Sequence, residues 1–178
     1  MRKIPLIALV VLHLSSCAVV PDPPFIHSEA FDESEVSWAF EEGSTTIEGS
    51  AYIIDRMGLN GTTHTCVGYA AKLIPKSGYA EEFFTYLFGN LEKSFWNYRG
   101  PTPYMTPGDL GYGAREENCD IDGRFVFYNV PSGTYYLVTT VYYVGGPLPT
   151  IPPDYRGGML LERVEVKDQE RLRVVMTP

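Results

Sequence analysis

Residues 120–136 read Asp120-Ile121-Asp122-Gly123-Arg124-Phe125-Val126-Phe127-Tyr128-Asn129-Val130-Pro131-Ser132-Gly133-Thr134-Tyr135-Tyr136. The Asp122-Gly123 step favours a turn, and the strand that it opens places Phe125 and Phe127 on one face. Pro131-Ser132-Gly133 then predicts a reversal of the chain. The strand that follows, residues 134–144, is apolar on both faces, which is typical of a central strand.

Further strands are predicted on both sides of this segment. Upstream, β-branched and aromatic residues predict a strand over 45–55, a hairpin turn at Asn60-Gly61 and a strand over 62–74. Downstream, 160–166 and 171–176 are predicted to form a hairpin turned at Lys167-Asp168-Gln169. About seven short strands separated by turns predict a mainly β fold, an antiparallel seven-stranded sandwich.

The segment 79–98 has a helical rather than an alternating period. Phe83, Leu87 and Leu91 recur every fourth residue, which predicts one amphipathic helix or two short helices broken at Gly89-Asn90. Residues 99–118, which are rich in proline, glycine and tyrosine, and the proline-rich residues 145–158 are predicted to be loops.

Several of these motifs resemble the carboxypeptidase regulatory-like domain, whose fold is the transthyretin-like β-sandwich. The resemblance rests on Asp122-Gly123-Arg124-Phe125 and Asn129-Val130-Pro131-Ser132-Gly133-Thr134-Tyr135, with Thr65-Cys66-Val67-Gly68 and Lys72-Leu73-Ile74-Pro75 upstream. It covers residues 45–144. Because this module is mostly an accessory or binding domain, the resemblance implies no catalytic residues and no cofactor.

The N-terminus reads as a bacterial lipoprotein signal peptide, residues 1–16. Arg2 and Lys3 precede an apolar run over 4–14, and Leu14-Ser15-Ser16-Cys17 is similar to a lipobox. The apolar run is shorter than the roughly 20 residues that a membrane-spanning helix needs. The resemblance implies a lipid on Cys17, and Ala18 after it favours the outer membrane of a two-membrane bacterium.

Residues 17–44 then form a candidate tether, and 45–178 the β-sandwich domain. Pro21, Pro23 and Pro24 favour an extended start, and the segment carries seven carboxylates before Gly43. Trp38 leaves open a second interpretation, in which one short helix or strand of this segment docks on the domain.

The charge limits the classes of partner. The full chain has a formal net charge of −8, and removal of Arg2 and Lys3 with the signal peptide makes the mature protein more acidic by two charges. Nucleic acid is therefore a disfavoured partner, because phosphates would repel this protein. The expected partners are the membrane, through the N-terminal lipid, and a second envelope protein or a glycan.

The cysteines fit an exported protein once Cys17 carries lipid. Cys66 and Cys119 then remain as a pair, for which an oxidising compartment favours a disulfide. Two buried free thiols and a metal site are the alternatives. The resemblance supports the disulfide, because a bacterial variant of the domain has a cysteine at the position of Cys119.

The sequence shows no set of residues typical of an enzyme, and we expect none. His27 and His64 are the histidines of the mature chain, too few for the iron site of the related intradiol dioxygenases. Asp120 and Asp122 suggest a calcium site only weakly, since a turn explains them. We therefore expect a non-catalytic, lipid-anchored envelope protein without a metal, whose sandwich binds another protein or takes part in envelope assembly.

Two alternatives stay open. Tyr104, Tyr112 and Tyr155 lie in or at the ends of the two predicted loops, where exposed aromatic rings could bind polysaccharide or could simply pack on the sandwich. The protein could also be a component of an envelope-spanning secretion complex, an analogy of fold alone.

Overall fold

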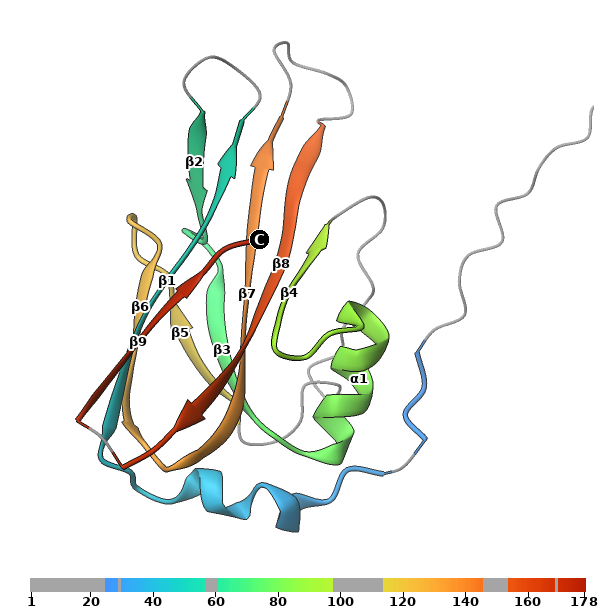
Figure 1. Cartoon of the computed structure of the whole chain (residues 1–178), viewed down its shortest axis with the longest axis vertical. Helices are drawn as coiled ribbons and strands as arrows, with labels where there is room; N and C mark the ends of the chain where they lie inside the picture. Colours follow the sequence, from blue (N-terminus) through green and yellow to red (C-terminus); the bar gives the residue numbers. More distant parts are fainter. Residues whose placement is uncertain (1–24, 29, 57–60, 98–113, 146–153, 169) are drawn as a thin grey trace, which may run out of the picture.

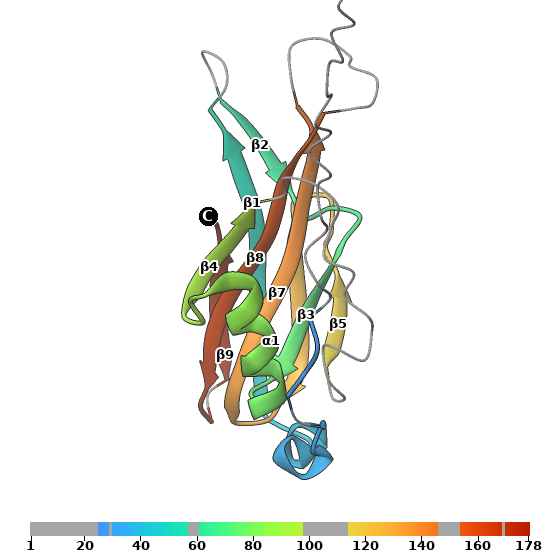
Figure 2. The same ribbon diagram turned by 90° about the vertical axis from the view of Figure 1, so that its right-hand side faces the viewer.

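The computed structural model describes residues 25–28, 30–56, 61–97, 114–145, 154–168 and 170–178. These residues form nine β-strands, one α-helix and two short 3-10 helices (Figure 1). The strands lie in two sheets, and α1 (Gly78–Phe88) covers part of the outer face of one sheet (Figure 2). The prediction of a mainly β, two-sheet fold is confirmed.

The first sheet is built around β1 (Thr45–Asp55) and is called the β1 sheet. Its other strands are β2 (Thr62–Thr65), β6 (Arg124–Val130) and β9 (Arg171–Met176). β2 and β6 pair with β1 in the antiparallel direction, as expected for the hairpin predicted around Gly61. β9 pairs with β1 in the parallel direction, with Ile47 opposite Leu172.

The second sheet, the β7 sheet, has the order β4-β8-β7-β3-β5 and is antiparallel throughout. Its strands are β3 (Ala70–Pro75), β4 (Lys93–Asn97), β5 (Arg115–Asn118), β7 (Gly133–Val144) and β8 (Tyr155–Val166). β7 lies in the middle, as its apolar faces predict.

The main core fills the space between the two sheets. Ile47 and Phe127 from the β1 sheet and Leu137 and Leu160 from the β7 sheet are almost fully buried there. Phe125 and Phe127 both point inward, as the alternation in the sequence predicts. A second cluster lies between α1 and the outer face of the β7 sheet. The protein is thus β-sandwich-like, with a helix on one outer face.

The predicted helix over 79–98 is wrong in its second half. Ser77 caps α1 by accepting a hydrogen bond from the Ala80 N–H, and α1 ends at Gly89, whose φ of 72° lies in the left-handed region that favours glycine. The chain then extends, and β4 pairs with β8. The apolar residues of this stretch fit either period, so only the free edge of β8 decides between helix and strand.

Other boundaries also differ from the predictions. The predicted strand 62–74 consists of two strands, β2 and β3, and the two predicted loops end in strands, the first in β5 and the second in the start of β8. The described residues therefore contain nine strands rather than seven. β5 is a short edge strand, whose polar residues resemble a loop in the sequence, whereas β4 lies in the segment predicted as helix.

The predicted hairpin of 160–166 and 171–176 is wrong. β8 pairs with β7 and β4, whereas β9 crosses to the other sheet and pairs with β1. Leu172, Val174 and Met176 face the main core, so burial of these side chains favours the crossing. β6 and β7 likewise belong to different sheets, and the Pro131-Ser132 turn joins them.

The Cys66–Cys119 disulfide is present. Both cysteines are buried, and they join the β2–β3 connection to the residue after β5. The alternatives of two free thiols or a metal site at these cysteines are therefore wrong.

Residues 25–28 and 30–40, which we call the N-terminal strap, pack on the domain. The 3-10 helices Glu33–Glu35 and Ser37–Phe40 bury Val36 and Ala39, and the Trp38 ring contacts Tyr135 edge to face. The docking through Trp38 that the sequence left open is thus what the structure shows. The signal peptide and Cys17 lie outside the described residues.

Among the described residues, no helix is long and apolar enough to span a membrane.

Candidate functional site

One of the three tyrosines considered for polysaccharide binding, Tyr155, belongs to the described part of the chain. It is the first residue of β8, and its side chain is 55% exposed. Tyr104 and Tyr112 lie outside the described residues. The surroundings of Tyr155 therefore decide what this end of the molecule can bind.

Tyr155 belongs to an apolar surface on the outer face of the β7 sheet. It lies directly opposite Val144 of β7, which is 61% exposed, and paired residues project from the same face of a sheet. Tyr142 lies two residues before Val144 on that face and meets the Tyr69 ring edge to face, with 5.8 Å between ring centroids. We call Tyr69, Tyr142, Val144 and Tyr155 the aromatic face.

The disulfide holds Tyr69 in this surface. Tyr69 directly precedes β3 and donates its N–H to the Cys66 carbonyl, and its own carbonyl accepts a hydrogen bond from the Cys119 N–H. Gly68, with φ of 84°, makes the turn that allows the first of these bonds. The covalent bond between Cys66 and Cys119 therefore fixes the backbone on both sides of the Tyr69 ring.

Gly157 of β8 lies beside Tyr142 and has no side chain that could cover it. It lies opposite Tyr142 on β8, and a Cβ at Gly157 would come within 2.0 Å of the Val141 carbonyl oxygen. Its φ of 105° also excludes most other residues. The glycine therefore keeps one flank of the Tyr142 side chain free of a cross-strand neighbour.

Polar groups gather at the same end of the molecule, on the inner side. The His64 ring of β2 stacks on Tyr143 of β7 with 3.7 Å between centroids, and Asp154 accepts two hydrogen bonds from the Arg156 guanidinium. Burial raises the pKa of Tyr143, and the nearby carboxylate of Asp55 raises it further. This end thus combines exposed rings with groups that donate and accept hydrogen bonds.

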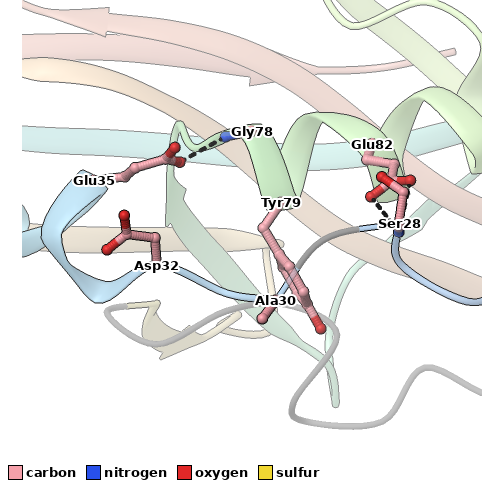
Figure 3. A pocket seen from close by; sticks show the side chains of 7 residues that line it. All are labelled: Ser28, Ala30, Asp32, Glu35, Gly78, Tyr79 and Glu82. Atoms are coloured by element: carbon pink, nitrogen blue, oxygen red, sulfur yellow. Dashed lines mark hydrogen bonds between the residues drawn. The ribbon is translucent and has the colours of Figure 1, made fainter.

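A hollow of about 520 Å³ lies between the N-terminal strap and α1 (Figure 3). Its lining residues are Ser28, Ala30, Asp32, Glu35, Gly78, Tyr79 and Glu82. Three carboxylates and the Tyr79 ring line this hollow, and we call it the acidic cleft.

The carboxylates of the acidic cleft already bind backbone groups. Glu35 accepts a hydrogen bond from the Gly78 N–H at the start of α1, and both oxygens of Glu82 accept from the Ser28 N–H (Figure 3). Hydrogen bonding to Ser28 lowers the pKa of Glu82, and hydrogen bonding to Ser34 lowers the pKa of Asp32. The acidic cleft is therefore the joint that fastens the strap, and these contacts explain its carboxylates without a ligand.

The aspartates considered for calcium are also engaged. Asp120 Oδ1 accepts hydrogen bonds from the N–H groups of Asp122 and Arg124, and the Asp122 carboxylate pairs with the Arg124 guanidinium. Within the described residues, no group of three or more histidines, cysteines or carboxylates could hold a metal ion. The arrangement at this turn is that of a hydrogen-bonded Asp-Gly turn.

Comparison with known proteins finds similarity in fold to a solved structure. No family model matches the chain, and no curated protein matches it. A solved structure of a candidate carbohydrate-binding protein from Pseudomonas aeruginosa superposes with a TM-score of 0.65 at 23% sequence identity. The alignment covers 84% of this chain and 99% of that one. At this level of identity the comparison shows a shared fold.

The sequence analysis missed Tyr69 and Tyr142 as members of the site. A signal existed for Tyr142, because Tyr142 and Val144 alternate on the face of β7 that carries Tyr136 and Val138 under α1. α1 is too short to cover the whole length of β7 (Figure 1). No sequence signal pointed to Tyr69, because the disulfide and the Gly68 turn position it.

Proposed function

We propose that this protein is a non-catalytic, lipid-anchored envelope protein that binds polysaccharide through the aromatic face. One observation carries the proposal: Tyr155 and Val144 stand exposed side by side on a sheet, next to the ring pair of Tyr69 and Tyr142. Soluble domains seldom expose several large apolar side chains together unless that surface binds something.

The chemistry of this surface suits a sugar chain. A pyranose ring has a face of C–H groups that packs on the electron-rich face of an aromatic ring, while its hydroxyls need hydrogen-bonding partners. The phenolic hydroxyls of Tyr69 and Tyr155, two of the exposed residues of the aromatic face, supply such groups on the face itself. Because the aromatic face is an open sheet surface, it suits a polymer more than a single enclosed sugar.

The charge of the protein narrows the ligand further. With a formal net charge of −8, the chain would repel polysaccharides rich in carboxylates or sulfates. We therefore propose a neutral polysaccharide. The structural relative from Pseudomonas aeruginosa, itself a candidate carbohydrate-binding protein, supports this class of ligand.

The anchor and the family belong to the same proposal. We propose that Cys17 carries the lipid, that the mature protein resides in the outer membrane of a two-membrane bacterium, and that the domain is a carboxypeptidase regulatory-like domain with transthyretin-like topology. The disulfide and the two-sheet fold support the family assignment. The lipobox over 14–17 supports the anchor.

Two substitutions test the aromatic face against a matched control. Tyr155→Ala should weaken retention on an immobilised neutral polysaccharide by about 3- to 10-fold, the loss of one aromatic contact. Tyr155→Phe should keep most of the binding, because the ring remains. Tyr128→Ala, a tyrosine 66% exposed on the opposite sheet, should bind like the parent protein. Equal binding by Tyr155→Ala and the parent would contradict the proposal.

A second candidate function is binding of another envelope protein. It is favoured by Val67 and Ile121, which lie on the two connections that the disulfide joins and are 43% and 79% exposed. These aliphatic side chains suit an apolar protein contact better than a sugar. Photo-crosslinking from position 121 in intact cells tests this, since a single specific product is expected and its absence would contradict it.

A further inference from the structure

The described part of the chain begins at Phe25, which packs beside α1. The Phe25 ring stacks on Tyr86 with 4.8 Å between centroids and meets Phe83 edge to face, and His27 stacks on Tyr79 at 3.3 Å. These partners belong to α1, which is itself packed on the β7 sheet. The first described residues are therefore fixed to the body of the domain.

The rest of the strap is fixed as firmly. Glu82 holds the Ser28 N–H, Glu35 holds the start of α1, and the Arg115 guanidinium donates to the Ala39 carbonyl. Trp38 lies directly on Gly133. The strap therefore cannot serve as a flexible spacer without breaking these contacts.

This docking leaves a short connection to the proposed anchor. Eight residue steps separate Cys17 from Phe25, and a fully extended chain spans at most about 3.6 Å per residue, hence roughly 29 Å. That reach is about the diameter of a small domain. A lipid on Cys17 would therefore keep the Phe25 side of the domain close to the bilayer.

The surface at that point is apolar. Ile26 is 78% exposed and Tyr86 is 53% exposed, and the Phe25 ring of the strap stacks on Tyr86. We call Phe25, Ile26 and Tyr86 the Phe25 corner. The Glu82 carboxylate on α1 accepts hydrogen bonds from the Ser28 N–H and lies 3.4 Å from His27 Nδ1, so its oxygens face protein groups.

We propose that the Phe25 corner contacts the lipid surface to which Cys17 is anchored. The inference rests on the proposed lipidation of Cys17. A tyrosine with an apolar ring and a polar hydroxyl, beside an isoleucine and a phenylalanine, suits the boundary between acyl chains and headgroups. The contact gives the domain a preferred orientation on the membrane in place of free rotation on a tether.

We expect the Phe25 corner to contact lipids with zwitterionic headgroups. Asp32, Glu33 and Glu35 lie on the strap close by, and the chain as a whole is acidic, so anionic headgroups would repel the domain. Attraction then comes from burial of apolar side chains and should be insensitive to salt.

The experiment uses the full lipidated protein in phosphatidylcholine vesicles. Ile26→Cys and Tyr128→Cys are each labelled with an environment-sensitive dye, since Cys66 and Cys119 are joined and a lipidated Cys17 has no free thiol. The comparison is the same labelled protein with Cys17→Ala, which has no lipid anchor and is kept in detergent-free solution. On the vesicles, we expect the emission of the dye at position 26 to shift to shorter wavelength. We also expect aqueous iodide to quench this dye several-fold less on the vesicles than in the Cys17→Ala protein. The label at 128, on the opposite outer face, should be quenched equally in both.

Each other outcome is informative. If the protein floats with the vesicles but the labels at 26 and 128 are quenched alike, the membrane contact is overturned and the anchor stands. If protection at 26 requires anionic lipid and disappears at high salt, the apolar contact is overturned. If the protein does not float at all, lipidation of Cys17 fails and this inference fails with it, whereas polysaccharide binding is judged separately by the Tyr155 variants.

Discussion

Trp38 of the N-terminal strap lies on the backbone of Gly133, at the first position of β7. A Cβ added at Gly133 would come within 2.1 Å of the Trp38 indole carbon Cζ3. The ring also meets Tyr135 edge to face, and its Nε1–H donates to the Glu35 carbonyl. The close approach is possible because residue 133 has no side chain, so this glycine couples the strap to the central strand.

Gly133→Ala should displace Trp38 and loosen the strap. Overpacking of this kind costs about 1–3 kcal/mol in the free energy of unfolding. Urea denaturation followed by tryptophan fluorescence measures the loss. Ser132→Ala, one residue earlier and exposed, is the control and should stay within about 0.5 kcal/mol of the parent. A stable Gly133→Ala protein with unchanged Trp38 fluorescence would contradict this role.

The double substitution Cys66→Ser and Cys119→Ser should strongly destabilise the domain. The disulfide links residues 53 apart in the sequence. For a loop of this length, the chain-entropy model gives a loss of roughly 4 kcal/mol on removal. Guanidinium denaturation without reductant checks the value. We also expect weaker polysaccharide binding by the still-folded fraction, because Tyr69 loses its fixed backbone.

Arg115→Ala should destabilise the contact between the two sheets and the strap. The Arg115 guanidinium donates to the carbonyls of Tyr128 and Asn129 and to that of Ala39. Losing these charge-assisted bonds should cost about 2–4 kcal/mol, and Arg115→Lys should restore only part, because an ammonium lacks the planar fork. Thermal denaturation compares both with Arg124→Ala, whose ion pair with Asp122 is exposed and should matter little.

Acid should release the strap before it unfolds the domain. The pKa of Glu82 is lowered from 4.5 by its bonds to Ser28, and the pKa of Asp32 is lowered from 3.8 by those to Ser34. A lowered pKa means that this stabilisation is complete above the unfolded-state values and is lost as pH falls through the folded-state values. Limited proteolysis of the strap should therefore be constant from pH 7 to pH 5 and increase below pH 4.

The Glu82→Gln variant checks the cause of that acid release. Its strap should be cleaved faster than that of the parent at pH 7, with a smaller further increase at low pH. Glu162→Gln, whose carboxylate pairs with Lys93 on β4 away from the strap, is the control. An identical pH profile in Glu82→Gln and the parent would assign the acid sensitivity to other groups.

The sequence alone determined the features that depend on neighbouring residues. Alternation over 124–130 predicted that Phe125 and Phe127 face the core, and the apolar faces of 134–144 predicted a central strand. The number of cysteines left after Cys17 predicted the disulfide. The first two predictions depend on the pattern of neighbouring residues, and the third depends on the number of cysteines. None of them requires knowledge of contacts between distant segments.

Only the tertiary structure decided the features that depend on which surface a segment meets. Residues 93–97 form a strand because β8 has a free edge, and β9 pairs in parallel with β1 because its apolar face is buried there. The strap docks because Gly133 leaves room for Trp38. In each case the two segments that meet are far apart in the sequence. The local sequence pattern of each segment is therefore compatible with more than one structure.

The candidate site divides in the same way. Tyr155 was singled out as an aromatic residue in a proline-rich predicted loop, but its neighbours Tyr69 and Tyr142 come from segments more than 70 residues apart along the chain. The sequence determines which side chains are aromatic and which strands carry them. Only the folded sheet and the disulfide decide that these rings share one exposed face, because hydrogen-bond register and a covalent crosslink set the distances between remote residues.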